Sequence, residues 1–133
     1  RAGGLAQVGP PAEIYSAPAN LFVARFFGQV NALSGTAAGG FVDSPLGRLT
    51  AESSDMSGPV DIGIRNEALL LGKTGAPATV ISARVLGPYS VVELALAGGI
   101  RVTVHVPGTA PPGPDDKVNV DFDRAQAFVF AKE

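Results

Sequence analysis

The tripeptide Gly72-Lys73-Thr74 is the part of this sequence whose residue types could most readily bind a phosphate. It has the order found at the end of a P-loop, in which backbone N–H groups and a lysine hold nucleotide phosphates. That loop needs another glycine five positions before Gly72, and Glu67 occupies this position. Because a carboxylate there would repel a phosphate, we predict an ordinary turn and no nucleotide site.

Acid–base and metal chemistry have few candidates in this chain. His105 is the only histidine and there is no cysteine, which excludes a histidine pair, a thiolate metal site and a disulfide within the chain. His105 stands between two valines in a strand pattern, and we expect it to face solvent. Asp115-Asp116 and the pair Asp121 and Asp123 lack the closely spaced oxygen ligands of a calcium loop. We therefore predict no catalytic residue, no metal site, no cofactor and no enzymatic activity.

The composition is that of a globular protein, with 46% hydrophobic and 17% charged residues among 133. The formal net charge is −2, and ten lysines and arginines are scattered among twelve acids, which argues against a nucleic-acid partner. No apolar stretch approaches the ~18–20 residues that cross a bilayer, so we expect no direct membrane insertion. The first residues, Arg1-Ala-Gly-Gly, contain neither a methionine nor a signal-peptide pattern, and we expect a fragment of a longer protein.

The elements that must position these residues change character near residue 30. Residues 10–28 carry helix signals, namely two segments begun by proline and the i,i+4 pairs Phe22/Phe26 and Val23/Phe27. From Asn31 onward apolar and polar residues alternate, as in antiparallel strands with one solvated face. Glycine- and proline-rich turns separate the runs. We predict strands at 31–35, 40–42, 48–51, 60–64, 78–86, 90–96, 100–106, 117–122 and 127–130.

This pattern of many short strands predicts a mainly β fold. We expect a small OB-like antiparallel barrel preceded by one or two short helices.

Three blocks of sequence resemble one known family. Residues 7–31, QVGPPAEIYSAPANLFVARFFGQVN, resemble the segment that leaves the nucleotide-binding domain of importer ATPases. Residues 60–71, VDIGIRNEALLL, are similar to the "I/V-R-P-E-x-L-x-L" stretch of the same subunits' transport-associated OB-fold (TOBE) domain, with Asn66 in place of the usual proline. Residues 113–122, GPDDKVNVDF, resemble the closing strand of that domain.

The resemblance implies an accessory regulatory and dimerisation domain of an ABC importer's ATP-binding subunit. Residues 1–29 would be a helical connector from the ATPase domain and residues 30–133 an OB-like β domain, with the catalytic motifs upstream of Arg1. The implied partners are a second copy, bound through the β domain, the parent ATPase domain and the importer's membrane subunits. The implied location is cytoplasmic, at the inner face of the membrane. The cargo stays open among ferric iron, sugars, polyamines, sulfate and phosphonates, with a slight preference for ferric iron because the tail is short.

Five residues are candidates for structural or interface roles. Arg65 and Glu67 lie at a predicted strand end, where charged side chains can bind exposed backbone groups or a twin subunit. An exposed ion pair there would contribute only ~0–1 kcal/mol. The competing expectation is therefore that neither residue matters for stability or association. Phe22, Phe26 and Phe27 would form an apolar helix stripe that the ATPase domain covers.

A free-standing OB-type module that binds nucleic acid or a small oxyanion is the alternative from another functional class. Tyr89 and Phe41 could stack on bases. The scattered cations make a poor electrostatic channel for a polyanion, however, so the sequence favours the importer interpretation.

Overall fold

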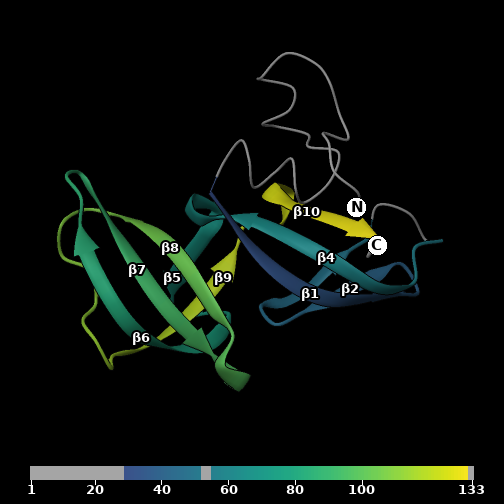
Figure 1. The fold of residues 1–133 in the computed structure, drawn as a ribbon, viewed down its shortest axis with the longest axis horizontal. Coiled ribbons are helices and arrows are strands. Elements are labelled where there is room, and N and C mark those ends of the chain that lie inside the picture. Colours follow the sequence, from purple (N-terminus) through teal and green to yellow (C-terminus); the bar gives the residue numbers. More distant parts are fainter. Residues whose placement is uncertain (1–28, 52–54, 132–133) are drawn as a thin grey trace, which may run out of the picture. The chain divides into compact units, whose positions relative to one another are not determined.

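The computed structural model describes residues 29–51 and 55–131 (Figure 1). That part of the chain is built of antiparallel strands and short 3-10 turns. The strands are β1 (Val30–Ala38), β2 (Phe41–Ser44), β3 (Gly47–Thr50), β4 (Gly58–Arg65), β5 (Leu69–Gly72), β6 (Ala76–Val85), β7 (Tyr89–Leu96), β8 (Arg101–Pro107), β9 (Lys117–Phe122) and β10 (Ala127–Ala131); the turns are η1 (Asn66–Ala68), η2 (Ala97–Gly99) and η3 (Arg124–Gln126).

The mainly β prediction is confirmed, and each predicted strand overlaps an observed one. The structure adds β5, which follows η1 directly and was not predicted. Gly72-Lys73-Thr74 lies where β5 ends in a bend, so the interpretation as a turn holds. The helices predicted within residues 10–28 lie outside the described residues.

The described residues divide into two compact units. One comprises residues 29–44, 48–51, 55–65 and 126–131, and the other comprises residues 45–47 and 66–125. Each unit contains one five-stranded antiparallel sheet. The predicted boundary near residue 30 falls beside residues that are not described, so it stays a prediction. The described residues after this boundary form two units.

The first unit is organised around β1 and β4, which pair from Val30 opposite Arg65 to Ala37 opposite Gly58. Its strand order is β10-β4-β1-β2-β3. Along β1 buried positions alternate with more exposed ones, whereas the end of β4 is buried on both faces from Ile62 to Arg65. The buried apolar side chains of these strands are Leu33, Ala37, Val42, Leu49, Val60, Ile62 and Ile64. Full burial of each larger aliphatic side chain stabilises the fold by about 1.5–3 kcal/mol.

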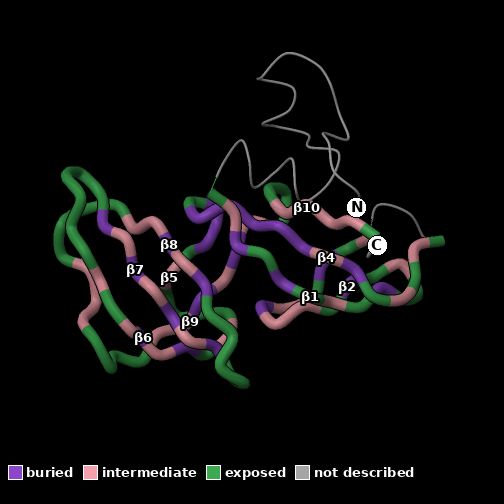
Figure 2. Tube along the Cα trace, viewed as in Figure 1, coloured by how far each residue is buried: buried purple, intermediate pink, exposed green. Residues whose placement is uncertain are grey.

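The second unit has the strand order β5-β9-β6-β7-β8. Buried and half-buried positions alternate along β7, and Figure 2 shows the same alternation in colour. The buried set forms the core of this unit: Leu69, Ala78, Val80, Val92, Leu94, Leu96, Val102, Val104, Val120 and Phe122. β5 and β8, at opposite ends of the strand order, curl toward each other, and no ladder joins them in the described chain.

No helix within the described ranges has the length and apolar character needed to span a membrane.

Candidate functional site

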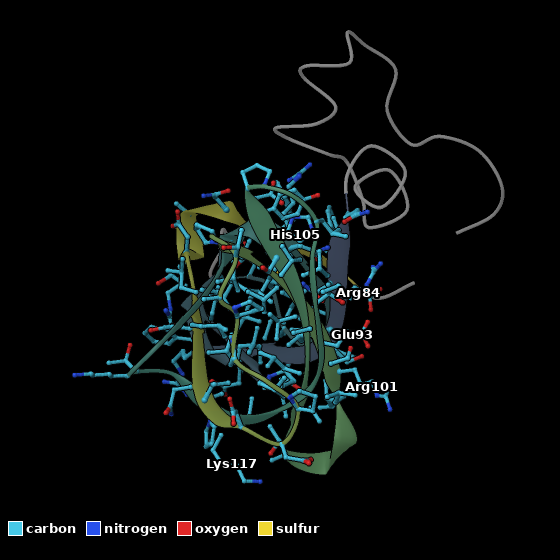
Figure 3. The ribbon with its side chains drawn as sticks, turned by 90° about the vertical axis from the view of Figure 1, so that its left-hand side faces the viewer. Arg84, Glu93, Arg101, His105 and Lys117 are labelled. Atoms are coloured by element: carbon cyan, nitrogen blue, oxygen red, sulfur yellow. The ribbon has the colours of Figure 1, made fainter. Side chains whose placement is uncertain are left out.

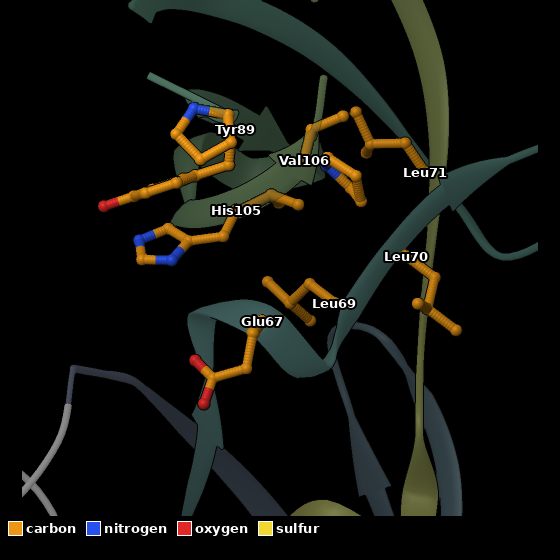
Figure 4. A pocket seen from close by; sticks show the side chains of 10 residues that line it. Glu67, Leu69, Leu70, Leu71, Tyr89, His105 and Val106 are labelled. Atoms are coloured by element: carbon orange, nitrogen blue, oxygen red, sulfur yellow. The ribbon is translucent and has the colours of Figure 1, made fainter. Parts of the chain in front are cut away.

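An apolar cavity of the second unit lies between β5 and β8. Its volume is about 480 Å³, and we call it the seam cavity (Figure 4). Its walls come from η1, β5, the start of β7 and the end of β8. The lining residues are Glu67, Leu69, Leu70, Leu71, Pro88, Tyr89, Val104, His105, Val106 and Pro107.

The hairpin of β7 and β8 positions one wall. Tyr89 pairs with Pro107 and Val91 with His105, so Tyr89 and His105 are diagonal neighbours on the same face of the sheet. Their rings are 5.0 Å apart between centroids and tilted by 38°. The end of the hairpin is fixed by the buried Ser90, whose hydroxyl donates a hydrogen bond of 2.9 Å to the Gly108 carbonyl.

The η1 turn and β5 form the opposite wall. The Asp123 amide donates a 2.9 Å hydrogen bond to the Ala68 carbonyl, which holds the end of η1 against the β9 end of the sheet. Leu69 is 2% exposed and belongs to the core, whereas Leu70 is 52% exposed. Glu67 is exposed at the edge of the cavity. The cavity therefore combines an apolar wall with one carboxylate.

Arg65 and Glu67 lie in different units and have different surroundings. Arg65 is the last residue of β4, where the sequence places it, and only 3% of it is exposed. Its guanidinium carbon lies 4.7 Å from the centroid of the Phe128 ring of β10, a cation–π geometry. Glu67 instead occupies η1. Phe22, Phe26 and Phe27 lie outside the described residues.

His105 differs from its sequence-based expectation. It is half-buried, stacks on Tyr89 and lines the seam cavity, instead of simply facing solvent. Neither His105 nor the leucines of β5 were predicted as site residues, and Tyr89 was considered only as a stacking residue of the alternative binding module. Tyr89 and His105 are diagonal neighbours because the hairpin turns over the three residues Ala97–Gly99. A two-residue turn at Gly98-Gly99 would have placed them on opposite faces, so the sequence alone did not reveal the pair.

The carboxylates near the end of β9 make local contacts. Asp121 accepts hydrogen bonds from the Phe122 amide at 2.9 Å and from Arg124 at 3.0 Å, and the pKa of Asp121 is lowered, chiefly by that amide and then by Arg124. Asp116 accepts a 2.8 Å bond from the Gly113 amide. In the described ranges no group of three or more histidine or acidic side chains is arranged to hold a metal ion.

The outward face of β6, β7 and β8 mixes charged and apolar side chains. Figure 3 shows Arg84, Glu93 and Arg101 along this side of the unit. Arg101 and Glu93 are 4.0 Å apart and largely exposed, so their attraction contributes little to stability. Val91, on the same face as Glu93, is half-buried. β7 thus carries apolar residues on both faces, as its sequence indicates.

The sequence is similar to a known domain family and to subunits of importers. The TOBE domain family model matches residues 62–130. The Fe(3+) ions import ATP-binding protein FbpC of Streptomyces avermitilis is 32% identical over 133 residues, covering 98% of this chain and 39% of that protein. The sulfate/thiosulfate import ATP-binding protein CysA of Xanthomonas campestris is 36% identical over 110 residues, covering 81% of this chain and 32% of that protein.

A solved structure supports the fold assignment. The cytoplasmic molybdate-binding protein ModG, with molybdate bound, superposes with a TM-score of 0.60 at 15% identity, covering 77% of this chain and 96% of that chain. At this identity the likeness concerns the fold alone, and with the curled antiparallel sheets it confirms the OB-like β class. Almost the whole of this chain is matched, but it spans only about two fifths of the length of that FbpC protein. On the match to residues 62–130 and on these relatives, the chain belongs to the TOBE domain family.

Proposed function

We propose that this chain is the accessory regulatory and dimerisation domain of the ATP-binding subunit of an ABC-type importer. The observation that carries the proposal is the end-to-end match of 98% of the chain to 39% of a ferric-ion import ATP-binding protein. A match of this extent to part of a larger subunit is the relation expected of an accessory domain.

Physical features of the described residues support self-association. In the second unit several large apolar side chains are exposed, among them Val85, Leu86 and Ile100. Half-buried apolar positions on the outward face of β7 add to this surface. A two-fold dimer would cover such a surface with one self-complementary patch. Arg65 would hold the end of β4 against Phe128 of β10 within the first unit. Glu67, exposed on η1, would contact a partner subunit bound there.

The same proposal places the chain at the cytoplasmic face of a membrane. There it would hold two ATP-binding subunits together beneath the importer's membrane subunits, without binding nucleic acid or entering the bilayer. Ferric iron is the cargo that we propose, because several similar proteins carry that name, with sulfate or thiosulfate next. The cargo would not contact this domain.

A chimera tests the proposal. The matching segment of the Streptomyces avermitilis FbpC protein is replaced by this chain, and subunit association and ATP hydrolysis are measured. We expect a dimeric chimera that hydrolyses ATP, because identity extends across the whole segment. A folded but monomeric chimera would contradict the association role. Calorimetric titration of this chain with molybdate checks the alternative of an oxyanion-binding module, and tight binding would favour it.

A further inference from the structure

The seam cavity is bordered by strand edges and not by a sheet face. Its lining includes the consecutive residues 69–71 of β5 and the consecutive residues 104–107 at the end of β8. A sheet face would contribute only alternate residues, because successive side chains of a strand point to opposite sides. β5 and β8 are the two end strands of this sheet, and no ladder joins them in the described chain. Two open strand edges therefore meet the same cavity.

The hydrogen-bond register of the β7–β8 hairpin shows which backbone groups line the edge of β8. The Leu96 amide donates to the Ile100 carbonyl at 2.7 Å, so these two residues form a hydrogen-bonded pair. Hydrogen-bonded and non-hydrogen-bonded pairs alternate along an antiparallel ladder. Five steps further along, the pair of Val91 and His105 is non-hydrogen-bonded. The N–H and C=O of His105 therefore point away from β7, toward the seam.

The same alternation applies to β5. The Asp123 amide donates to the Ala68 carbonyl at 2.9 Å, so the pair of Leu71 and Val120, three steps along, is non-hydrogen-bonded. The backbone groups of Leu71 thus point away from β9. Within the described ranges neither these groups nor those of His105 form a hydrogen bond to another part of the chain. A partner for them is favoured, because an unpaired backbone group beside apolar surface is costly.

The side chains around these edges are apolar, and the cavity calls for no charge. Leu70 is 52% exposed, and it lines the cavity together with Val106 and Pro107 (Figure 4). Glu67, the one acidic lining residue, already has an interaction of its own. The volume of about 480 Å³ lies within the range of roughly 300–1,000 Å³ that is typical of binding pockets. The best complement is a free backbone edge that carries uncharged, apolar side chains.

We propose that the seam cavity binds an extended, uncharged peptide segment of another protein, which adds a strand to the edge of β8. The peptide exchanges two backbone hydrogen bonds with His105, and one of its apolar side chains lies beside Leu70 and Val106. In such strand addition the backbone bonds supply affinity and the pocket supplies selectivity. β8, with seven residues against four in β5, is the longer template.

The surroundings of the edge favour a single strand as the occupant. η1 and β5 both lie next to β8. An edge strand of a folded second copy would bring its own sheet against them, whereas an isolated extended segment has only its own width. This binding role stands apart from the association role and does not depend on it.

The test uses the 133-residue chain and the blocked peptide acetyl-Ser-Leu-Thr-Leu-Ser-amide, with amide hydrogen exchange followed by NMR. The His105 amide should exchange rapidly in the free chain. At a peptide concentration of about nine times Kd, its exchange should slow about tenfold. The Val104 and Val106 amides, which bond to β7 by the same alternation, should be protected with or without peptide.

Two N-methylated peptides distinguish strand addition from unspecific apolar binding. Backbone groups of neighbouring residues in a strand point to opposite edges. Methylation of the nitrogen of the first leucine and of the central threonine therefore removes a donor from opposite edges, while all side chains stay. Only one of the two peptides should lose affinity, by about tenfold, since it alone loses a bond to β8.

Two alanine variants of exposed residues check the side-chain contact. Leu70→Ala should weaken binding about five- to tenfold, because part of the burial of a leucine is lost. Ile100→Ala, at the other end of the β7–β8 hairpin and 37% exposed, is the control and should bind like the unsubstituted chain.

Any of four results overturns the proposal. These are no binding at about 1 mM peptide, the weak end of the affinity scale; protection of the Leu71 amide in place of His105; equal affinity of the two N-methylated peptides; or an unchanged affinity of Leu70→Ala. If the His105 amide is already protected in the free chain and light scattering shows that the peptide dissociates a dimer, a second copy occupies the edge and the proposal fails.

Discussion

Replacement of Gly75 by alanine should destabilise the second unit more than any comparable glycine replacement. Gly75 lies just before β6, with φ of +105°, and an added Cβ would overlap the carbonyl oxygen of Val120 and lie 2.7 Å from the amide nitrogen of Asp121. Both atoms belong to the backbone of β9, which pairs with β5 and β6 and cannot turn aside as a side chain could. The strand itself would have to move.

Gly87 provides a matched control. Its φ of +110° is nearly the same, and an added Cβ there would meet no atom within 4 Å. Both alanines cost about 1–3 kcal/mol because of the backbone conformation. Only Gly75→Ala adds a steric conflict with the backbone, and forced overpacking costs about 1–3 kcal/mol more. This difference corresponds to roughly 4–8 °C in Tm for each kcal/mol in a unit of this size.

Thermal and urea unfolding followed by circular dichroism measure both variants against the unsubstituted chain. Hydrogen exchange should show the extra loss at the β9 amides of Gly75→Ala. If the two alanine variants lose the same stability within about 0.5 kcal/mol, the spread expected of neutral substitutions, the close approach of the β5–β6 turn to β9 is wrong.

Three further predictions concern charged groups and nucleotides. Arg65→Lys should lower the free energy of unfolding by about 1–2 kcal/mol, because a buried ammonium cannot replace the flat guanidinium on Phe128, whereas the exposed Glu67→Ala should change it by less than about 0.5 kcal/mol; urea titration compares them. The pKa of Asp121 is lowered, chiefly by the Phe122 amide, so the ionised carboxylate stabilises the fold above the ordinary pKa of 3.8 and this stabilisation is lost as pH falls below it. Asp121→Asn should therefore make the urea midpoint depend less on pH between about pH 5 and 2.5. An unchanged pH dependence would refute this. Calorimetry with Mg²⁺ and ATP should detect no binding, and micromolar affinity would contradict the interpretation of residues 72–74 as a turn.

The strands could be predicted because their alternation and turn residues are local signals. Val102-Thr-Val-His-Val and Val118-Asn-Val-Asp-Phe both have a period of two, and both form strands. β5 was missed because Leu69, Leu70 and Leu71 are all apolar, so the alternation between the core residue and its exposed neighbour is invisible in the sequence. In β5 the inward and outward faces differ in how far their leucines are buried, and not in residue type.

The arrangement of the strands could not be read in the same way. β10 pairs with β4, and β9 lies between β5 and β6, so both depend on contacts far apart in the chain. The division into two units follows from these pairings. The seam cavity follows from them too, because it forms only where the first and last strands of one sheet's order approach. Arg65 could be placed at a strand end, but its stacking on Phe128 required the β4–β10 pairing.

The mass of the chain in solution tests the association role most directly. Multi-angle light scattering at about 100 μM, where even a weak specific interface populates the dimer, is applied to the full chain and to a chain that begins at residue 29. We predict about 27 kDa for the full chain, twice its 13.5 kDa, and a dimer for the shorter chain as well. A monomeric mass for the shorter chain, with its β-sheet circular dichroism intact, would contradict dimerisation through the β strands.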